Sequence, residues 1–118
     1  MKYMLAIVED YAEYPGGVEG EAFRKICEAH GAIVEEMIKA GVFVHGAGLL
    51  GPDVATTVRI TKGKRSVHDG PFAESKEQLG GFYVLDVPDL DAAIAWAKRL
   101  PTYADAAIEI RPTLPDEM

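Results

Sequence analysis

Two short segments of this chain are apolar on both of their alternating faces, and this feature restricts the fold more than any other. Residues 3–9 place Tyr, Leu and Ile on one face and Met, Ala and Val on the other, and residues 81–87 repeat the pattern. Such strands are typical of a sheet that is covered on two sides. We therefore expect both strands to lie in a sheet whose two faces each meet another layer.

Two segments carry apolar residues at helical spacing. The first spans residues 21–40 and ends at Gly41, a residue suited to the left-handed position after a helix. The second follows Asp89, which we expect to cap the helix, and stops before Pro101. Two helices cover only one face of such a sheet, so the other face is predicted to meet a second copy in a homodimer.

The remaining regular segments read as strands and turns. Gly51-Pro52-Asp53 and Lys62-Gly63-Lys64 are turn sequences, and the second connects a short hairpin. Further strands are expected at residues 42–50, 54–60, 65–68 and 106–111. The order predicts an α+β, ferredoxin-like βαββαβ fold with an inserted hairpin.

Length and composition are those of one globular domain. The chain has 118 residues, of which 48% are apolar and 26% charged, enough to bury roughly two thirds of the unfolded surface in one core. We expect a single domain over residues 1–113 and a loose tail over residues 114–118.

The charge distribution argues against nucleic acid and anionic membranes as partners. The formal net charge is -7, and the twelve basic residues are scattered along the sequence. The apolar run at the start is too short for a signal peptide or a membrane span, so a cytoplasmic protein is expected. Cys27 is the only cysteine; it cannot form an internal disulfide and is expected to pack as a small apolar residue.

His30 is the first candidate for chemistry. It lies one helical turn after Ile26 and one turn before Val34, so its imidazole should point toward the sheet. A half-buried imidazole near a carboxylate can have a pKa near neutrality, which suits a general acid or base. A core histidine whose nitrogens are satisfied by backbone or water explains the same position equally well.

Other arrangements of the polar residues have weaker support. His30, His45, His68 and Asp69 could together hold a metal ion, but their spacing matches no metal motif. The glycines at positions 46, 48 and 51 are better explained by turns and bulges than by a phosphate site. We expect no cofactor and no metal.

A longer motif covers residues 69–83, which begin Asp69-Gly70-Pro71-Phe72 and end in Gly-Gly-Phe-Tyr. This run resembles the signature of the DGPF branch of the YCII-related family. The similarity continues at residues 89–93 and 109–112, and upstream at residues 2–5, 40–42 and 56–59, so it extends over nearly the whole chain. The resemblance implies a ferredoxin-like domain that pairs through its sheets into a dimeric α+β barrel, with a cavity near the sheet and the long helix.

The resemblance also implies site residues. Other branches of the family resemble an enzyme with a His and Asp acid/base pair, whose His lies on the first helix eleven residues before the glycine that ends it; His30 has this spacing to Gly41. By the same resemblance Asp69 is the predicted partner, although an Asp before Gly-Pro is also a common turn former. Many relatives carry Thr where this chain has His68, so His68 could alter or replace the role of His30.

Three functions compete at this point. The first is a lyase-like or isomerase-like enzyme that uses His30 and Asp69 on a small, mostly apolar substrate. The second is a non-catalytic ligand-binding or regulatory dimer with a protein partner, since relatives resemble partners of extracytoplasmic sigma factors. The third is a dimer whose polar residues are structural only. A cavity that holds His30 would favour the first two.

Overall fold

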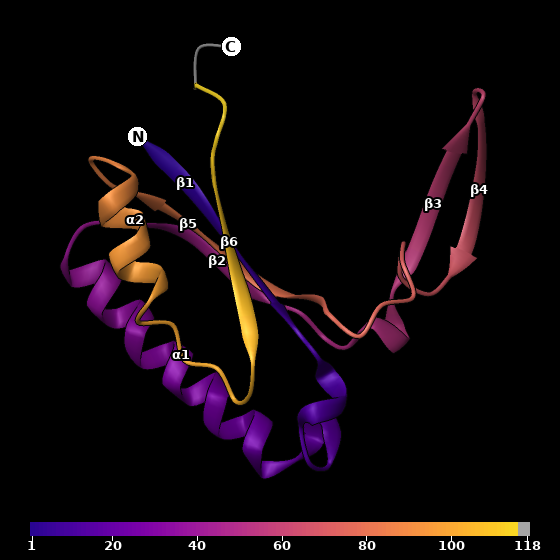
Figure 1. The fold of residues 1–118 in the computed structure, drawn as a ribbon, viewed down its shortest axis with the longest axis horizontal. Coiled ribbons are helices and arrows are strands. Elements are labelled where there is room, and N and C mark those ends of the chain that lie inside the picture. Colours follow the sequence, from indigo (N-terminus) through magenta and orange to yellow (C-terminus); the bar gives the residue numbers. More distant parts are fainter. Residues whose placement is uncertain (116–118) are drawn as a thin grey trace.

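The computed structural model describes residues 1–115, which form an α+β body and a separate β-hairpin (Figure 1). The body contains β1 (Lys2–Glu9), α1 (Glu21–Lys39), β2 (Phe43–Gly48), β5 (Gln78–Asp86), α2 (Leu90–Ala97) and β6 (Ala106–Pro112). The hairpin consists of β3 (Thr56–Thr61) and β4 (Lys64–Asp69). Short 3-10 turns occupy Tyr11–Glu13, Gly17–Glu19 and Pro52–Val54.

The sheet of the body has the strand order β2-β5-β1-β6, with antiparallel pairing throughout. This is the ferredoxin-like order, with β3 and β4 inserted between the second and third strands of the core motif. The α+β, ferredoxin-like prediction is therefore confirmed, and the two strands apolar on both faces are the two central strands. Pairing of two such sheets into a dimeric barrel remains a prediction.

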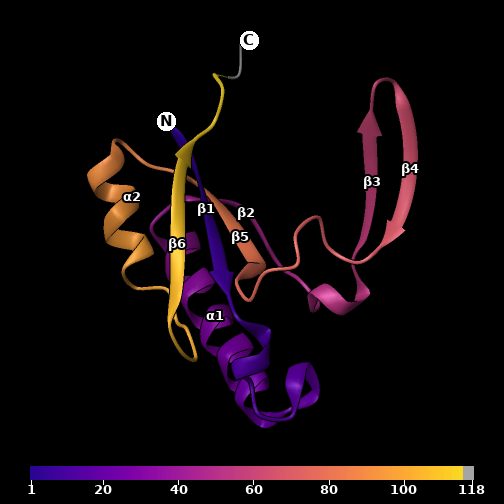
Figure 2. The same ribbon diagram turned by 45° about the vertical axis from the view of Figure 1, so that its right-hand side comes forward.

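Both helices lie against the same face of the sheet (Figures 1 and 2). The side chains of this face alternate along the central strands, beginning with Tyr3, Leu5 and Ile7 on β1. They pack on Ile33 and Met37 of α1, and Leu5 and Met37 are fully buried. The core further includes Tyr83, Leu85, Val87, Ala93, Ala97 and Leu100.

The first helix ends and the second begins where the sequence predicts, whereas α2 ends at Ala97 and does not continue to Pro101. Gly41 has a φ of +75°, which a residue with a side chain rarely adopts, and this conformation ends α1. Asp89 caps α2 by accepting a hydrogen bond from the Ala92 amide at 2.9 Å. In the described chain no helix is both long and apolar enough to cross a bilayer. The last three residues of the predicted loose tail lie outside the described residues.

The opposite face of the sheet has no covering layer in residues 1–115. Met4, Val8, Phe82 and Val84 lie on this face and are only partly buried. The second apolar face of the central strands is therefore present, and the protomer alone leaves it accessible.

Candidate functional site

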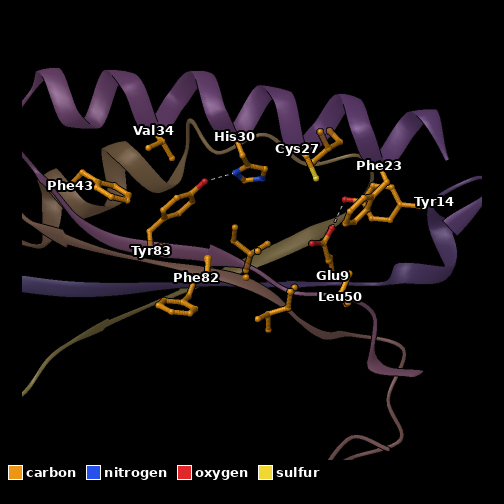
Figure 3. A pocket seen from close by; sticks show the side chains of 18 residues that line it. Glu9, Tyr14, Phe23, Cys27, His30, Val34, Phe43, Leu50, Phe82 and Tyr83 are labelled. Atoms are coloured by element: carbon orange, nitrogen blue, oxygen red, sulfur yellow. Dashed lines mark hydrogen bonds between the residues drawn. The ribbon is translucent and has the colours of Figure 1, made fainter. Parts of the chain in front are cut away.

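A cavity of about 460 Å³ lies between α1 and the sheet (Figure 3). Most of its wall is apolar, and the polar groups that reach it are few. Its lining residues are Ile7, Glu9, Tyr14, Phe23, Ile26, Cys27, His30, Val34, Phe43, Gly46, Ala47, Gly48, Leu49, Leu50, Gly80, Gly81, Phe82 and Tyr83. An apolar cavity with a few convergent polar groups is typical of a small-molecule site.

His30 projects from α1 into this cavity and contacts Tyr83 of β5. The imidazole Nδ1 and the Tyr83 hydroxyl oxygen are 2.7 Å apart, and the ring centroids are 5.8 Å apart. When Nδ1 carries no proton the hydroxyl donates to it, and when Nδ1 is protonated the hydroxyl oxygen accepts. The bond therefore forms whether or not Nδ1 carries a proton, and it fixes the orientation of the ring. In the neutral imidazole Nε2 carries the proton when Nδ1 does not.

Burial in the cavity favours the neutral form of the imidazole. Burial lowers the pKa of His30 from its ordinary value, while the Glu9 charge and a backbone hydrogen bond at Pro101 act in the opposite direction. Burial likewise raises the pKa of Tyr83 to about 12, so its hydroxyl stays protonated. In the tautomer whose Nδ1–H donates to the Tyr83 oxygen, Nε2 is the nitrogen that can accept a proton from a bound molecule.

Glu9 supplies a carboxylate at the other end of the cavity. It lies at the end of β1 on the helix-facing side, and its Oε1 accepts a hydrogen bond from the Tyr14 hydroxyl at 2.6 Å. Burial and this bond raise the pKa of Tyr14. Tyr11, near this end, donates to the Leu49 carbonyl oxygen at 2.7 Å. The cavity thus carries a proton acceptor at one end and an anion at the other.

Two glycines make room for these groups. A Cβ on Gly46 would lie 2.6 Å from Cδ1 of Tyr83, and one on Gly80 would collide with the Glu9 carboxylate. Side chains at either position would displace the phenol or the carboxylate from the cavity. The turn or bulge role that the sequence suggests for Gly46 does not include this close approach of a side chain from the neighbouring strand.

Cys27 does not pack as a small apolar residue, so that expectation was wrong. Its side chain is exposed and lies at the cavity wall, one turn before His30 on α1. Desolvation and the nearby Glu9 charge raise the pKa of the thiol. The nucleophilic thiolate is disfavoured in this setting, so the geometry gives no support to cysteine chemistry.

Asp69 and His68 lie on the hairpin, away from the cavity. Asp69 ends β4 opposite Thr56, and His68 Nε2 lies 3.1 Å from the Ser66 hydroxyl oxygen; both side chains are exposed. Neither residue lines the cavity that holds His30, and the hairpin extends away from the body (Figure 2). A single protomer therefore does not bring the predicted His30 and Asp69 together.

The three histidines are likewise separated. His45 lies on β2 with its ring 5.9 Å from that of Phe82, outside the cavity lining. Within residues 1–115 no three potential ligands gather into a metal site. The structure thus gives the metal alternative no support.

Sequence reasoning missed Glu9 and Tyr83. The period of two along β1 places Glu9 on the same face as Leu5 and Ile7, and a carboxylate on a core face is a signal for a site. Tyr83 gives a weaker signal, because a tyrosine on a central strand is an ordinary core residue.

The fold and the cavity define a small α+β protein with a candidate ligand site beside its long helix. Comparison with known proteins identifies the family: residues 1–115 match the model of the YCII-related domain, and this chain belongs to that family. It is also 39% identical over 83 residues to an uncharacterized protein of Rhizobium meliloti (strain 1021), an alignment that covers 69% of this chain and 67% of the relative.

Proposed function

We propose that this protein binds a small, mostly apolar organic molecule in the cavity and moves a proton on it, with His30 as the acid/base. The observation that carries this proposal is the bond between His30 Nδ1 and the Tyr83 hydroxyl, which orients a half-buried, neutral imidazole inside the cavity. Isomerisation or elimination of a substrate with an acidic C–H bond fits this arrangement.

The chemistry assigns each polar group a separate task. His30 takes the proton from carbon and returns it to the product or to water, while Tyr83 holds the ring. Glu9 raises the proton affinity of the imidazole by its charge and disfavours anionic substrates at its end of the cavity. The rest of the cavity wall is apolar and favours a substrate whose remaining part is small and apolar.

The test is exchange of carbon-bound hydrogen in D₂O. Small carbonyl compounds that shift the amide resonances of the cavity residues are incubated with the protein, and deuterium uptake at the carbon next to the carbonyl is followed by NMR. We expect uptake with the wild type and loss of uptake in His30→Gln. Glu35→Gln is the control, because Glu35 lies exposed on the same helix outside the cavity lining.

Two results would contradict the catalytic proposal. Equal uptake in His30→Gln and the wild type would remove His30 from the chemistry, and loss of uptake in His68→Gln alone would transfer the role to His68. Ligands that bind in the cavity without exchange would favour the alternative function, a non-catalytic ligand-binding or regulatory dimer.

Asp69 keeps its predicted role only if a second copy supplies it to His30. We propose that the working form is a homodimer that covers the open sheet face, where Met4, Val8, Phe82 and Val84 lie. An NMR titration of His30 in Asp69→Asn decides the question for Asp69. A changed pKa would place the carboxylate of a second copy beside His30, and an unchanged pKa would leave Glu9 as the carboxylate of the site.

A further inference from the structure

The β-hairpin formed by β3 and β4, residues 56–69, extends from the body as an arm (Figures 1 and 2). Its six residue pairs run in register from Thr56 and Asp69 to Thr61 and Lys64. Lys62 and Gly63 have φ values of +52° and +79°, the two positive values of a tight hairpin turn. The arm is therefore a fully formed hairpin.

The arm has one apolar and one polar face. Residues opposite each other in the ladder share a face, so Val58 and Val67 lie side by side with Ile60 beyond them, and Arg65 stands opposite Ile60 on this face. The three apolar side chains are 58%, 69% and 60% exposed, respectively. A two-stranded hairpin with an exposed apolar face is marginally stable in water on its own, so packing of this face on a partner would stabilise the arm.

The arm and the body carry opposite charge. The arm has four basic residues and one acidic residue, whereas the remainder of the chain has eight basic and eighteen acidic residues. The basic side chains are those of Arg59, Lys62, Lys64 and Arg65, so a third of the basic residues gather here and are not scattered as described above. The surface that best complements a positive arm with an apolar face is a negatively charged protein surface with apolar patches, which the body of a second copy provides.

The connection between arm and body carries further exposed apolar side chains. A second hollow of about 450 Å³ lies where the arm leaves the body, and Leu50, Val54 and Phe72 on its wall are 68%, 62% and 75% exposed. Leu49 and Leu50 line both this hollow and the cavity of His30. Of the arm itself only Thr57 lines this hollow, on the face opposite Val58 and Val67. The hollow therefore joins the base of the arm to the edge of the candidate site.

From these observations we infer that the arm of each protomer packs on the body of a second copy of this chain, through its apolar face of Val58, Ile60 and Val67. Asp69 lies on this same face of the arm, opposite Thr56. Docking of the arm therefore turns Asp69 toward the partner's body. In this arrangement the carboxylate of the family motif can approach the cavity of the other protomer. The inference rests on the proposed homodimer and is independent of catalysis.

The first experiment is sedimentation velocity on the full chain over a range of micromolar concentrations. The test variant is Val58→Lys with Val67→Glu, which keeps an attractive cross-strand pair and the net charge while it removes the apolar face. The control is Thr61→Lys with Ser66→Glu on the polar face, also neutral in net charge. We expect the test variant to weaken the dimer by about tenfold or more and the control to leave it unchanged.

The second experiment locates the arm. A spin label is attached at Thr61→Cys in a Cys27→Ser background, and this protein is mixed with isotope-labelled wild type that carries no spin label. Broadening of body amides in the isotope-labelled protomer supports the inference, since only a partner's arm brings the label there.

Three results would overturn the inference. They are a wild type that stays monomeric, a dimer unaffected by loss of the apolar face, and a dimer whose body amides show no broadening from the partner's label. The first removes the proposed dimer as well, and the other two remove only the role of the arm. Tight binding of labelled duplex DNA that depends on the four basic residues, with no dimer, would instead identify the arm as a nucleic-acid-binding ribbon.

Discussion

Replacement of Tyr83 by Phe removes only the hydroxyl that holds His30. Tyr83 is 6% exposed, and its ring packs edge-on against Phe43 with a centroid distance of 6.5 Å, so the ring itself should stay in place. The lost bond joins the hydroxyl oxygen to Nδ1 of His30 at 2.7 Å. A hydrogen bond of this kind has a net value of about 1 kcal/mol, since water entering the cavity satisfies part of what is lost.

We therefore expect Tyr83→Phe to lower the free energy of unfolding by about 1 kcal/mol. The assay is urea denaturation at one fixed protein concentration, because dimerisation makes apparent stability depend on concentration. A double-mutant cycle with His30→Ala should give a coupling energy of about 1 kcal/mol between the two residues. Tyr103→Phe is the control, since its side chain is exposed and the change should stay within about 0.5 kcal/mol.

Additivity of Tyr83→Phe and His30→Ala in this cycle would refute the reasoning. It would show that the hydroxyl and the imidazole do not support each other, and the orientation of His30 would need another source.

Three further predictions concern the site and the helices. Glu9→Gln should lower the pKa of His30 in an NMR titration, because the Glu9 charge favours the imidazolium; an unchanged pKa would contradict this. Since burial lowers the pKa of His30 in the folded state, the unfolded chain binds the proton more readily, and stability should fall as the pH drops below about 6.5. The contribution should stay below about 1.4 kcal/mol per pH unit, because the half-buried ring is partly solvated, and it should vanish from urea titrations of His30→Gln. Asp89→Ala should cost about 1 kcal/mol by thermal unfolding, and Asp89→Asn much less, since the amide oxygen still caps α2.

The elements of the fold could be predicted because their signals are local. Gly41 and Asp89 determine where helices end and begin, and the Lys62-Gly63 turn determines the hairpin register. Each of these effects depends on the φ preference or hydrogen-bonding capacity of one or two residues, so neighbours in the sequence suffice.

The composition of the site could be predicted only in part. The position of His30 in the apolar stripe of α1 correctly directs its imidazole into the space between helix and sheet. Its contact with Tyr83 joins residues 53 positions apart, and the approach of Glu9 depends on which strands become neighbours. Such contacts follow from strand order and close packing, which no local pattern encodes.

The sequence by itself determined the secondary structure, the ferredoxin-like order and the presence of a second apolar sheet face, because residue periodicity and turn chemistry act over short distances. Only the tertiary structure decided that His30 faces Tyr83 and Glu9 while Asp69 lies on an arm outside its own protomer's cavity. The physical reason is that an exposed hairpin and a hairpin folded back on its body have the same local pattern. The two arrangements differ in whether the rest of the fold offers a surface on which the hairpin can pack.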